Sequence, residues 1–193
     1  PADPEVPMEA FMRAWTTVVA CGNQLTVESR ARTLGIDPTD LGDDGALAAV
    51  AERATRLAVA HGRTCSGADY IAALDVVHAL GRTMARFFQP YDVLLTATMG
   101  EPPTRIGRFA TERRDAWQSF LEYRLEHVLP NSPFTALANG TGQPAMSVPL
   151  WWNDAGLPVG THLMGRAGED HVLLQLATQL EEADPWFHRR PSL

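Results

Sequence analysis

The chain has 193 residues, of which 45% are hydrophobic and 20% are charged, and its formal net charge is -7 at pH 7. This length and composition suffice for one sizeable core with a small helical extension. An acidic chain offers no basic stripe for a phosphate backbone or an anionic membrane surface, so we expect no nucleic acid and no membrane as partner. Because no apolar run approaches a membrane span and the first residues have neither the basic nor the apolar region typical of a secretory signal, we expect a cytoplasmic protein.

The chain contains no lysine, because all 16 of its basic residues are arginine. Chemistry that needs a lysine amine is therefore excluded for these residues. Pro1 in place of a start methionine suggests that the chain begins partway through a longer product. Cys21 and Cys65 are too few and too far apart in the sequence for a disulfide framework or a metal site, and we expect both to be structural.

Residues 1–89 are predicted to be mainly helical. Apolar residues recur at near-helical spacing from Met8 to Leu34, although Gly22-Asn23 could divide this segment into two shorter helices. A further helix is predicted from Ala46 to His61, and another from Ser66 to about Phe88.

The last of these helices has a clear start signal. Ser66-Gly67-Ala68-Asp69 is a capping-box variant, in which the Ser66 hydroxyl accepts the Asp69 amide while the Asp69 carboxylate reaches back to the Ser66 amide. The pattern predicts that the helix begins beside Ser66.

Residues 90–193 are predicted to form the α/β core part of the same domain. Tyr91 to Ala97 is a short apolar run that is typical of a buried strand. Ala145 to Trp151 and Leu157 to Arg166 are predicted to be antiparallel strands, because a polar turn joins them. Helical patterns cover two further segments, Thr111 to Val128 and Glu169 to Ala183.

One long ordered segment resembles a known family. Phe134 to Pro149, FTALANGTGQPAMSVP, followed by Gly156 to Gly160, GLPVG, is similar to the C-terminal core of the amidase signature family. Tyr91 to Thr98, with Pro102-Pro103 after it, resembles the strand and pocket loop of that family, although the family usually has proline where Ala97 stands.

The segment upstream extends the resemblance over most of the chain. Ser66 to Tyr70 and the helix through Phe88 also fit the family, especially its branch that resembles 6-aminohexanoate cyclic dimer hydrolase. The resemblance implies an α/β fold, the C-terminal portion of the amidase signature fold, with a mixed β-sheet covered by helices and a helical N-terminal part.

The resemblance also implies a hydrolase that cleaves carboxamides through a serine, a second serine in a cis peptide and a lysine. In the family these three residues lie upstream of the segments matched here. The serines of this chain are all isolated and no lysine can activate them, so we expect no catalytic residue in this chain. Glutamine-dependent members carry an acidic residue where Ser132 stands, which argues against a glutamine-specific amidotransferase.

Five residues are candidates for substrate binding. Asn139, Thr141 and Gln143 stand in what reads as a loop bounded by glycine and proline, where amide and hydroxyl groups could orient a carboxamide. Thr96 and Thr98 flank the end of the Tyr91 strand, where α/β proteins usually place ligands. Hydrogen bonding of these side chains to their own backbone is the alternative for each of them.

No cofactor and no metal are predicted. The six histidines show no HExxH motif or other close pairing, so the sequence contains no metal-site pattern. Cys65 and Ser147 have no recognisable activating neighbour in the sequence, which argues against a self-contained cysteine or serine hydrolase.

Two functions remain open from the sequence. The leading hypothesis is the C-terminal fragment of an amidase, inactive alone, with a small-molecule amide as substrate and the missing N-terminal amidase segment as partner. The alternative is a non-catalytic binding or association module derived from an amidase, in which exposed edge strands and apolar surface favour a homo-oligomer.

Overall fold

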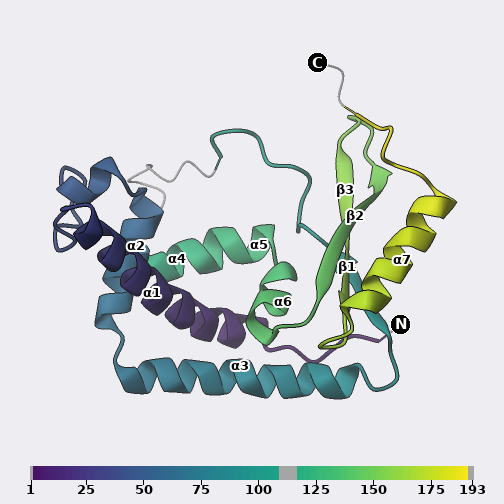
Figure 1. The fold of residues 1–193 in the computed structure, drawn as a ribbon, viewed down its shortest axis with the longest axis horizontal. Helices are drawn as coiled ribbons and strands as arrows, with labels where there is room; N and C mark the ends of the chain where they lie inside the picture. Colours follow the sequence, from purple (N-terminus) through teal and green to yellow (C-terminus); the bar gives the residue numbers. More distant parts are fainter. Residues whose placement is uncertain (1, 109–116, 191–193) are drawn as a thin grey trace. The chain divides into compact units, whose positions relative to one another are not determined.

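The computed structural model describes residues 2–108 and 117–190. By their contacts, the residues divide into two units (Figure 1). The sheet unit contains Pro1–Val6, Leu80–Thr104 and Asn131–Leu193, and the helical unit contains Pro7–Ala79 and Arg105–Pro130. Across the described ranges, no helix is long and apolar enough to cross a membrane. The sequence analysis divided one domain after residue 89 into a mainly helical part and an α/β part. That division stays a prediction.

The helical unit begins with one long helix, α1 (Met8–Thr33), which runs through Gly22-Asn23 without a break. The Asn23 amide donates to the Val19 carbonyl oxygen at 2.9 Å, so it bonds within the helix and does not terminate it. α1 packs against α2 (Arg53–Thr64), and Ala20 and Ala58 form a small core with Phe120.

The helix predicted from Ala46 to His61 is wrong at its start. The structure has a short 3-10 turn, η1 (Ala46–Ala49), and α2 begins only at Arg53 because Glu52 is extended, with φ -60° and ψ 156°. The buried guanidinium of Arg56 explains the break. It donates to the Ala51 carbonyl oxygen at 2.6 Å, which fixes the backbone in a nonhelical position between the two elements.

The helix predicted over Thr111 to Val128 lies partly outside the described residues. Its described part starts at α4 (Phe120–Tyr123), with the Ser119 hydroxyl accepting from the Glu122 amide at 3.1 Å. It continues as the π-helical η2 (Arg124–Val128) and α5 (Leu129–Asn131). Pro130 has no backbone amide to donate, so the regular backbone hydrogen bond of an α-helix is lost at this position. The wider π-helical turn lies just before it.

The helix α3 (Gly67–Phe87) confirms the predicted capping box. The Ser66 amide donates to the Asp69 carboxylate at 2.8 Å, and the Asp69 amide donates to the Ser66 hydroxyl at 3.1 Å. One stripe of buried side chains follows at helical spacing: Ala73, Val77, Leu80, Met84 and Phe88.

The sheet unit contains three strands in the order β1-β3-β2, namely β1 (Val93–Ala97), β2 (Ala145–Trp152) and β3 (Pro158–Gly165). β3 pairs antiparallel with both neighbours, so the predicted hairpin is confirmed. The Asn153 side chain closes its turn by accepting the amides of Ala155 and Leu157.

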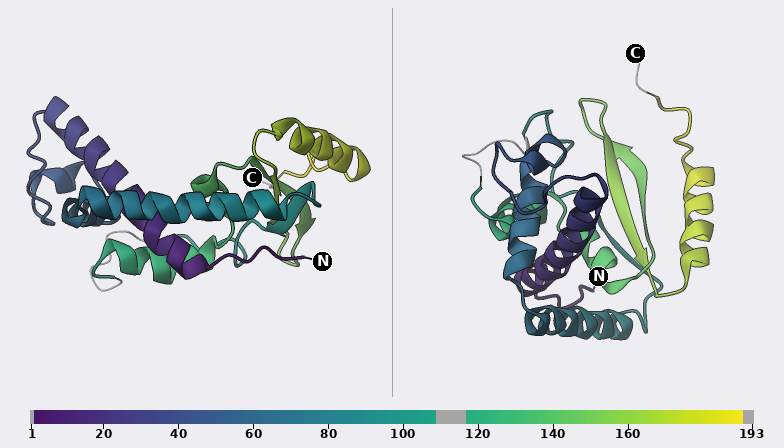
Figure 2. Two further views of the ribbon diagram at one scale, coloured as in Figure 1. Left: turned by 90° about the horizontal axis from the view of Figure 1, so that it is seen from below. Right: turned by 60° about the vertical axis from the view of Figure 1, so that its left-hand side comes forward.

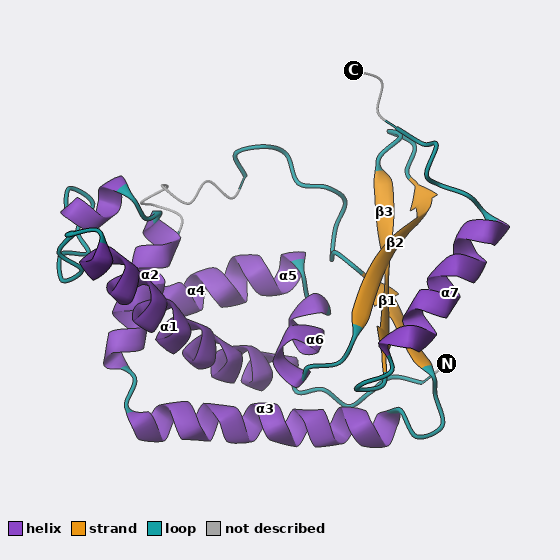
Figure 3. Cartoon of the chain, in the orientation of Figure 1, coloured by secondary structure: helices purple, strands orange, loops and turns teal. Residues whose placement is uncertain are grey.

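The two faces of this sheet differ. Val148 and Leu163 on one face pack with Leu173 of α7 (Asp170–Ala183), and α7 lies along the sheet in both orientations (Figures 1 and 2). The other face carries Thr96, Thr98, Ser147 and His162, because side chains alternate along a strand and these residues share the register across the sheet. We call this side the polar face. Figure 3 shows the helices and the three strands of this chain by secondary structure, which is the α/β class that was predicted.

Candidate functional site

The structure brings Thr96 and Thr98 together with two residues that the sequence analysis had not selected. The Thr96 hydroxyl lies 2.9 Å from Nδ1 of His162, which stands opposite it on β3. His162 is 3% exposed, and its burial lowers the pKa of the imidazole. The polar face therefore presents a neutral histidine oriented by a hydroxyl group at neutral pH.

Thr98 and Ser147 form the second contact on this face. Their hydroxyl oxygens are 2.6 Å apart, although Ser147 lies on the outer strand β2 and Thr98 directly follows the other outer strand, β1. Gly160 of β3 lies between them, and the Thr98 amide donates to its carbonyl oxygen at 3.0 Å. A Cβ on Gly160 would lie 2.6 Å from the Thr98 hydroxyl and 2.8 Å from the Ser147 hydroxyl. The absence of a side chain at Gly160 is what allows the two hydroxyls to meet.

A cleft of about 270 Å³ opens beside this contact. Its walls are the loop Met99–Pro103 and the hairpin residues Trp151, Asn153 and Pro158–Gly160. The loop is held at its base, because the Gly100 amide donates to the Asn131 carbonyl oxygen at 2.9 Å. The sequence predicted a pocket loop at these prolines, and the structure places it at the C-terminal end of β1.

Asn139 and Thr141 do not lie in a loop, which corrects the sequence-based interpretation. They belong to the short helix α6 (Thr135–Thr141), and Gly142 ends it with a left-handed φ of 75°. The Thr141 hydroxyl donates to the Leu137 carbonyl oxygen at 2.7 Å and also bonds the Gln143 side chain. The alternative of local bonding therefore holds for Thr141, while Asn139 is exposed on the helix surface.

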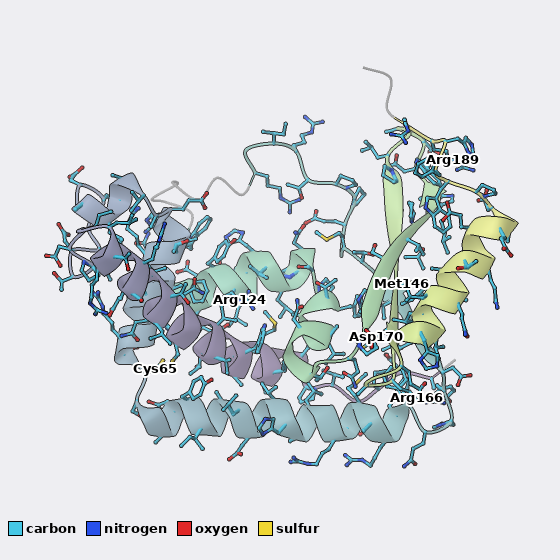
Figure 4. The ribbon with its side chains drawn as sticks, viewed as in Figure 1. Cys65, Arg124, Met146, Arg166, Asp170 and Arg189 are labelled. Atoms are coloured by element: carbon cyan, nitrogen blue, oxygen red, sulfur yellow. The ribbon has the colours of Figure 1, made fainter. Side chains whose placement is uncertain are left out.

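Gln143 and Thr141 line a second cavity, of about 520 Å³, together with Arg166. Gln143 is 8% exposed. Arg166 is labelled in Figure 4, where it lies near the far end of α3. Its guanidinium donates to the Phe88 carbonyl oxygen at 2.9 Å and pairs with Asp92 at 2.9 Å. Because the charge of Arg166 is already paired, this cavity favours a neutral polar ligand over an anion.

These groups can bind a carboxamide but form no nucleophilic centre. Hydroxyl, amide and neutral imidazole groups all donate and accept hydrogen bonds. The Ser147 hydroxyl is bonded to the Thr98 hydroxyl, and the His162 imidazole lies at hydrogen-bond distance from the Thr96 hydroxyl. Residues 2–108 and 117–190 contain no cluster of three His, Cys, Asp or Glu side chains that could hold a metal ion.

The sequence analysis missed Ser147, Gly160 and His162. Ser147 and His162 are polar residues within predicted strands, at alternate positions that face away from the apolar side. That alternation is a signal for one shared face. The pairing of Thr98 with Ser147 requires the strand order β1-β3-β2, which the sequence does not specify.

Comparisons with known proteins identify the family. The family model described as Amidase matches residues 17–174. The chain belongs to the amidase family. It is 41% identical over 114 residues to a protein of Mycobacterium tuberculosis (strain ATCC 25618 / H37Rv) provisionally named amidase AmiC, covering 59% of this chain and 23% of that protein. It is 29% identical over 133 residues to 6-aminohexanoate-cyclic-dimer hydrolase of Paenarthrobacter ureafaciens, covering 66% of this chain and 26% of the hydrolase.

Solved structures agree with the amidase family. A structure of 6-aminohexanoate cyclic dimer hydrolase complexed with substrate matches 99% of this chain and 38% of its own, with a TM-score of 0.82 and 25% identity. A bacterial aryl acylamidase of the amidase signature family shares the fold, with a TM-score of 0.74 and 21% identity, over 99% of this chain and 39% of its own. The chain spans about a quarter of the length of the curated relatives named above. The recognised family and the predicted fold class are confirmed.

Proposed function

We propose that this amidase-family chain is the C-terminal portion of a serine-dependent amidase that hydrolyses carboxamide bonds. In this proposal the Ser-Ser-Lys catalytic centre stands on a preceding segment, and the present chain supplies one wall of the pocket. The observation that carries the proposal is the family match over residues 17–174 in a chain without lysine. A serine nucleophile that is activated by lysine must take that lysine from residues outside this chain.

The described serines support this division of labour. Ser66 and Ser119 cap helices, and Ser147 is bonded to the Thr98 hydroxyl. Each of these three hydroxyls has a structural partner, that of Ser66 being the Asp69 carboxylate of its own capping box, and none of the three is bonded to the lysine that the family's nucleophile requires.

The polar face is the proposed contact surface for the amide. Thr98 and Ser147 bond one another next to a cleft, and either hydroxyl can turn to donate to an amide oxygen or accept from an amide nitrogen. We keep Thr96, Asn139, Thr141 and Gln143 as further proposed substrate-binding residues. Thr96 would act with His162, and Gln143 from the second cavity.

The proposed substrates are linear or cyclic amides. One relative is named for the hydrolysis of a cyclic dimer of 6-aminohexanoate, which contains amide bonds within a ring. The cleft beside Thr98 has mainly apolar walls, with Asn153 as a neutral polar residue and Glu101 as its charged lining residue. Such walls suit a neutral amide group.

The missing N-terminal segment is the proposed partner, and the edges of the sheet favour it. β1 and β2 are the outer strands, and each exposes a large apolar side chain, Leu95 at 65% and Trp151 at 59%. Exposed edges of this kind pair readily with another strand. The same observation favours the alternative function, an association module that forms a homo-oligomer.

The substrate-contact proposal is tested by Thr98→Val in the enzyme restored with its preceding segment. We expect kcat/KM for amides to fall by about tenfold or more with the midpoint of thermal unfolding little changed, because one donor to the substrate is lost. Thr178→Val is the matched control, since Thr178 bonds its own helix on α7 at 3.1 Å. Equal kcat/KM in the two variants would remove Thr98 from the site.

A further inference from the structure

A further cavity, of about 690 Å³, lies in the sheet unit, where the hairpin of β2 and β3 meets the segment that follows α7. The hairpin contributes Trp152 and Leu157 to its walls, and the segment after α7 contributes Trp186, Phe187 and two adjacent arginines. Arg189, the first of these arginines, is labelled in Figure 4 beside the hairpin end of the two strands. None of the residues proposed above for substrate binding lines this cavity.

The segment after α7 is held in place by its first aromatic residue. Trp186 packs against the core formed by Val148, Leu163 and Leu173. A turn follows, in which the Arg189 amide donates to the Trp186 carbonyl oxygen at 2.9 Å. The cavity is therefore bounded by an anchored turn on one side and by two paired strands on the other.

Both arginines of the cavity lie over aromatic rings. The guanidinium carbon of Arg189 is 4.0 Å from the centre of the Trp152 ring, and that of Arg190 is 5.0 Å from the centre of the Phe187 ring. A guanidinium that contacts a ring through its face keeps the N–H groups at its edge available for hydrogen bonds. Such an edge matches a carboxylate, to which it donates two parallel hydrogen bonds.

The two guanidinium groups differ in their charge partners. Arg189 pairs with Asp184 at 3.3 Å on the exposed surface. Within residues 2–108 and 117–190, no carboxylate pairs with Arg190. None of the described residues that line the cavity is acidic. The cavity is therefore locally positive, although the chain as a whole has a formal net charge of -7.

We propose that this cavity binds an aromatic carboxylate, a small molecule that joins a planar ring to one carboxylate group. The carboxylate accepts hydrogen bonds from the edge of the Arg190 guanidinium, with Arg189 beside it. The ring packs against the aromatic and aliphatic walls, of which Phe187 is 74% exposed and Leu157 41% exposed without a ligand. The volume is that of an ordinary small-molecule site. This proposal does not depend on the amidase function, because it concerns binding by this chain alone.

Nuclear magnetic resonance of the whole nitrogen-15-labelled chain tests the proposal. The indole N–H signals of the tryptophans are assigned from Trp→Phe variants and followed during a titration with benzoate. We expect the signals of Trp152 and Trp186 to shift along one saturating curve with a Kd on the order of 1 mM, while those of Trp15 and Trp117 stay in place. Unchanged signals of Trp152 and Trp186 at benzoate concentrations about tenfold above that value would overturn the proposal.

Two analogues of benzoate separate the contributions of charge and ring. Benzamide keeps the ring but replaces the carboxylate with a neutral group, and we expect its Kd to be about tenfold higher or more. Cyclohexanecarboxylate keeps the charge but lacks the flat ring, and we expect its Kd to be about threefold higher. Binding of either analogue as tightly as benzoate would overturn the assigned ligand class.

Two variants separate the cavity from the general surface charge. Arg190→Gln should raise the Kd for benzoate by about tenfold, because it removes a charged donor from the cavity. Arg13→Gln is the matched control, since Arg13 lies on the exposed surface of α1, and it should leave the Kd unchanged. Circular dichroism checks that both variants fold. An unchanged Kd in folded Arg190→Gln, or an equal loss in both variants, would contradict the proposed site.

Discussion

The hydroxyl of Thr98 lies 2.6 Å from the hydroxyl of Ser147, and the two meet across a residue without a side chain, Gly160. Ser147 of β2, Gly160 of β3 and Thr98, the residue that follows β1, form this contact. The contact lies on the polar face of the sheet, and its geometry depends on the size of residue 160.

Gly160→Ala should destabilise the chain by about 1–3 kcal/mol, because the added methyl group would overlap both hydroxyls. Urea unfolding followed by circular dichroism measures the change. Gly81→Ala is the control, since a Cβ at Gly81 of α3 meets nothing within 4 Å, and it should leave stability equal or raise it by about 0.5–1 kcal/mol. Equal effects of the two substitutions would show that the contact between Thr98 and Ser147 is not formed.

Arg56→Ala should cost about 1–3 kcal/mol, because it removes a buried guanidinium that bonds the Ala51 carbonyl oxygen and the solvent-accessible Asp43 carboxylate, and it leaves a cavity. Arg56 is 3% exposed and pairs with Asp43 at 2.6 Å. Arg13→Ala is the comparison, since Arg13 pairs with Glu9 on the exposed surface of α1 at 2.8 Å, and its loss should cost about 0.5 kcal/mol or less. Similar midpoints in urea for the two variants would contradict the buried position of Arg56.

Acidification should weaken the fold through His162, before the carboxylates titrate. Burial lowers the pKa of His162 below its ordinary 6.5. The contribution of His162 to the free energy of unfolding is therefore complete at a pH above the pKa of the unfolded chain. It is lost as the pH falls through 6.5 towards the lower folded-state pKa, because only the unfolded chain then binds the proton. Unfolding free energies between about pH 7.5 and about pH 5 should fall less in His162→Gln than in the wild type. The exposed His188 provides the control, and His188→Gln should retain the wild-type slope.

Asp69→Asn should shorten or fray the start of α3, because the capping box loses its charged acceptor. The Asp69 carboxylate accepts the Ser66 amide at 2.8 Å and the Ser66 hydroxyl at 2.7 Å. Hydrogen exchange of the amides in the first turn of α3 provides the readout. Unchanged protection there would contradict the capping role.

Part of the fold was predictable because local signals agreed with it. The capping box at Ser66 and the polar turn at Asn153 fixed the ends of their elements, and both use side chains that bond the nearby backbone. The helix α6 was missed because Gly140 and Gly142 read as loop residues, whereas Gly142 ends the helix in a left-handed conformation. The delayed start of α2 was missed because it depends on the buried Arg56 side chain.

The candidate site was predictable only in its outline. Thr96 and Thr98 follow from their place at the end of a strand, but their partners His162 and Ser147 come from strands far away in the sequence. Contacts between distant segments need the tertiary fold, and spacing along the chain does not contain them.

The most direct test of the proposed function is amide hydrolysis, followed as ammonia or amine release from a panel of linear and cyclic amides. The chain is assayed alone and together with the preceding segment of its gene product. We predict no turnover by the chain alone, because it contains no lysine, and turnover once the segment is restored. Hydrolysis by the chain alone would contradict the proposal and require a nucleophile among its own residues.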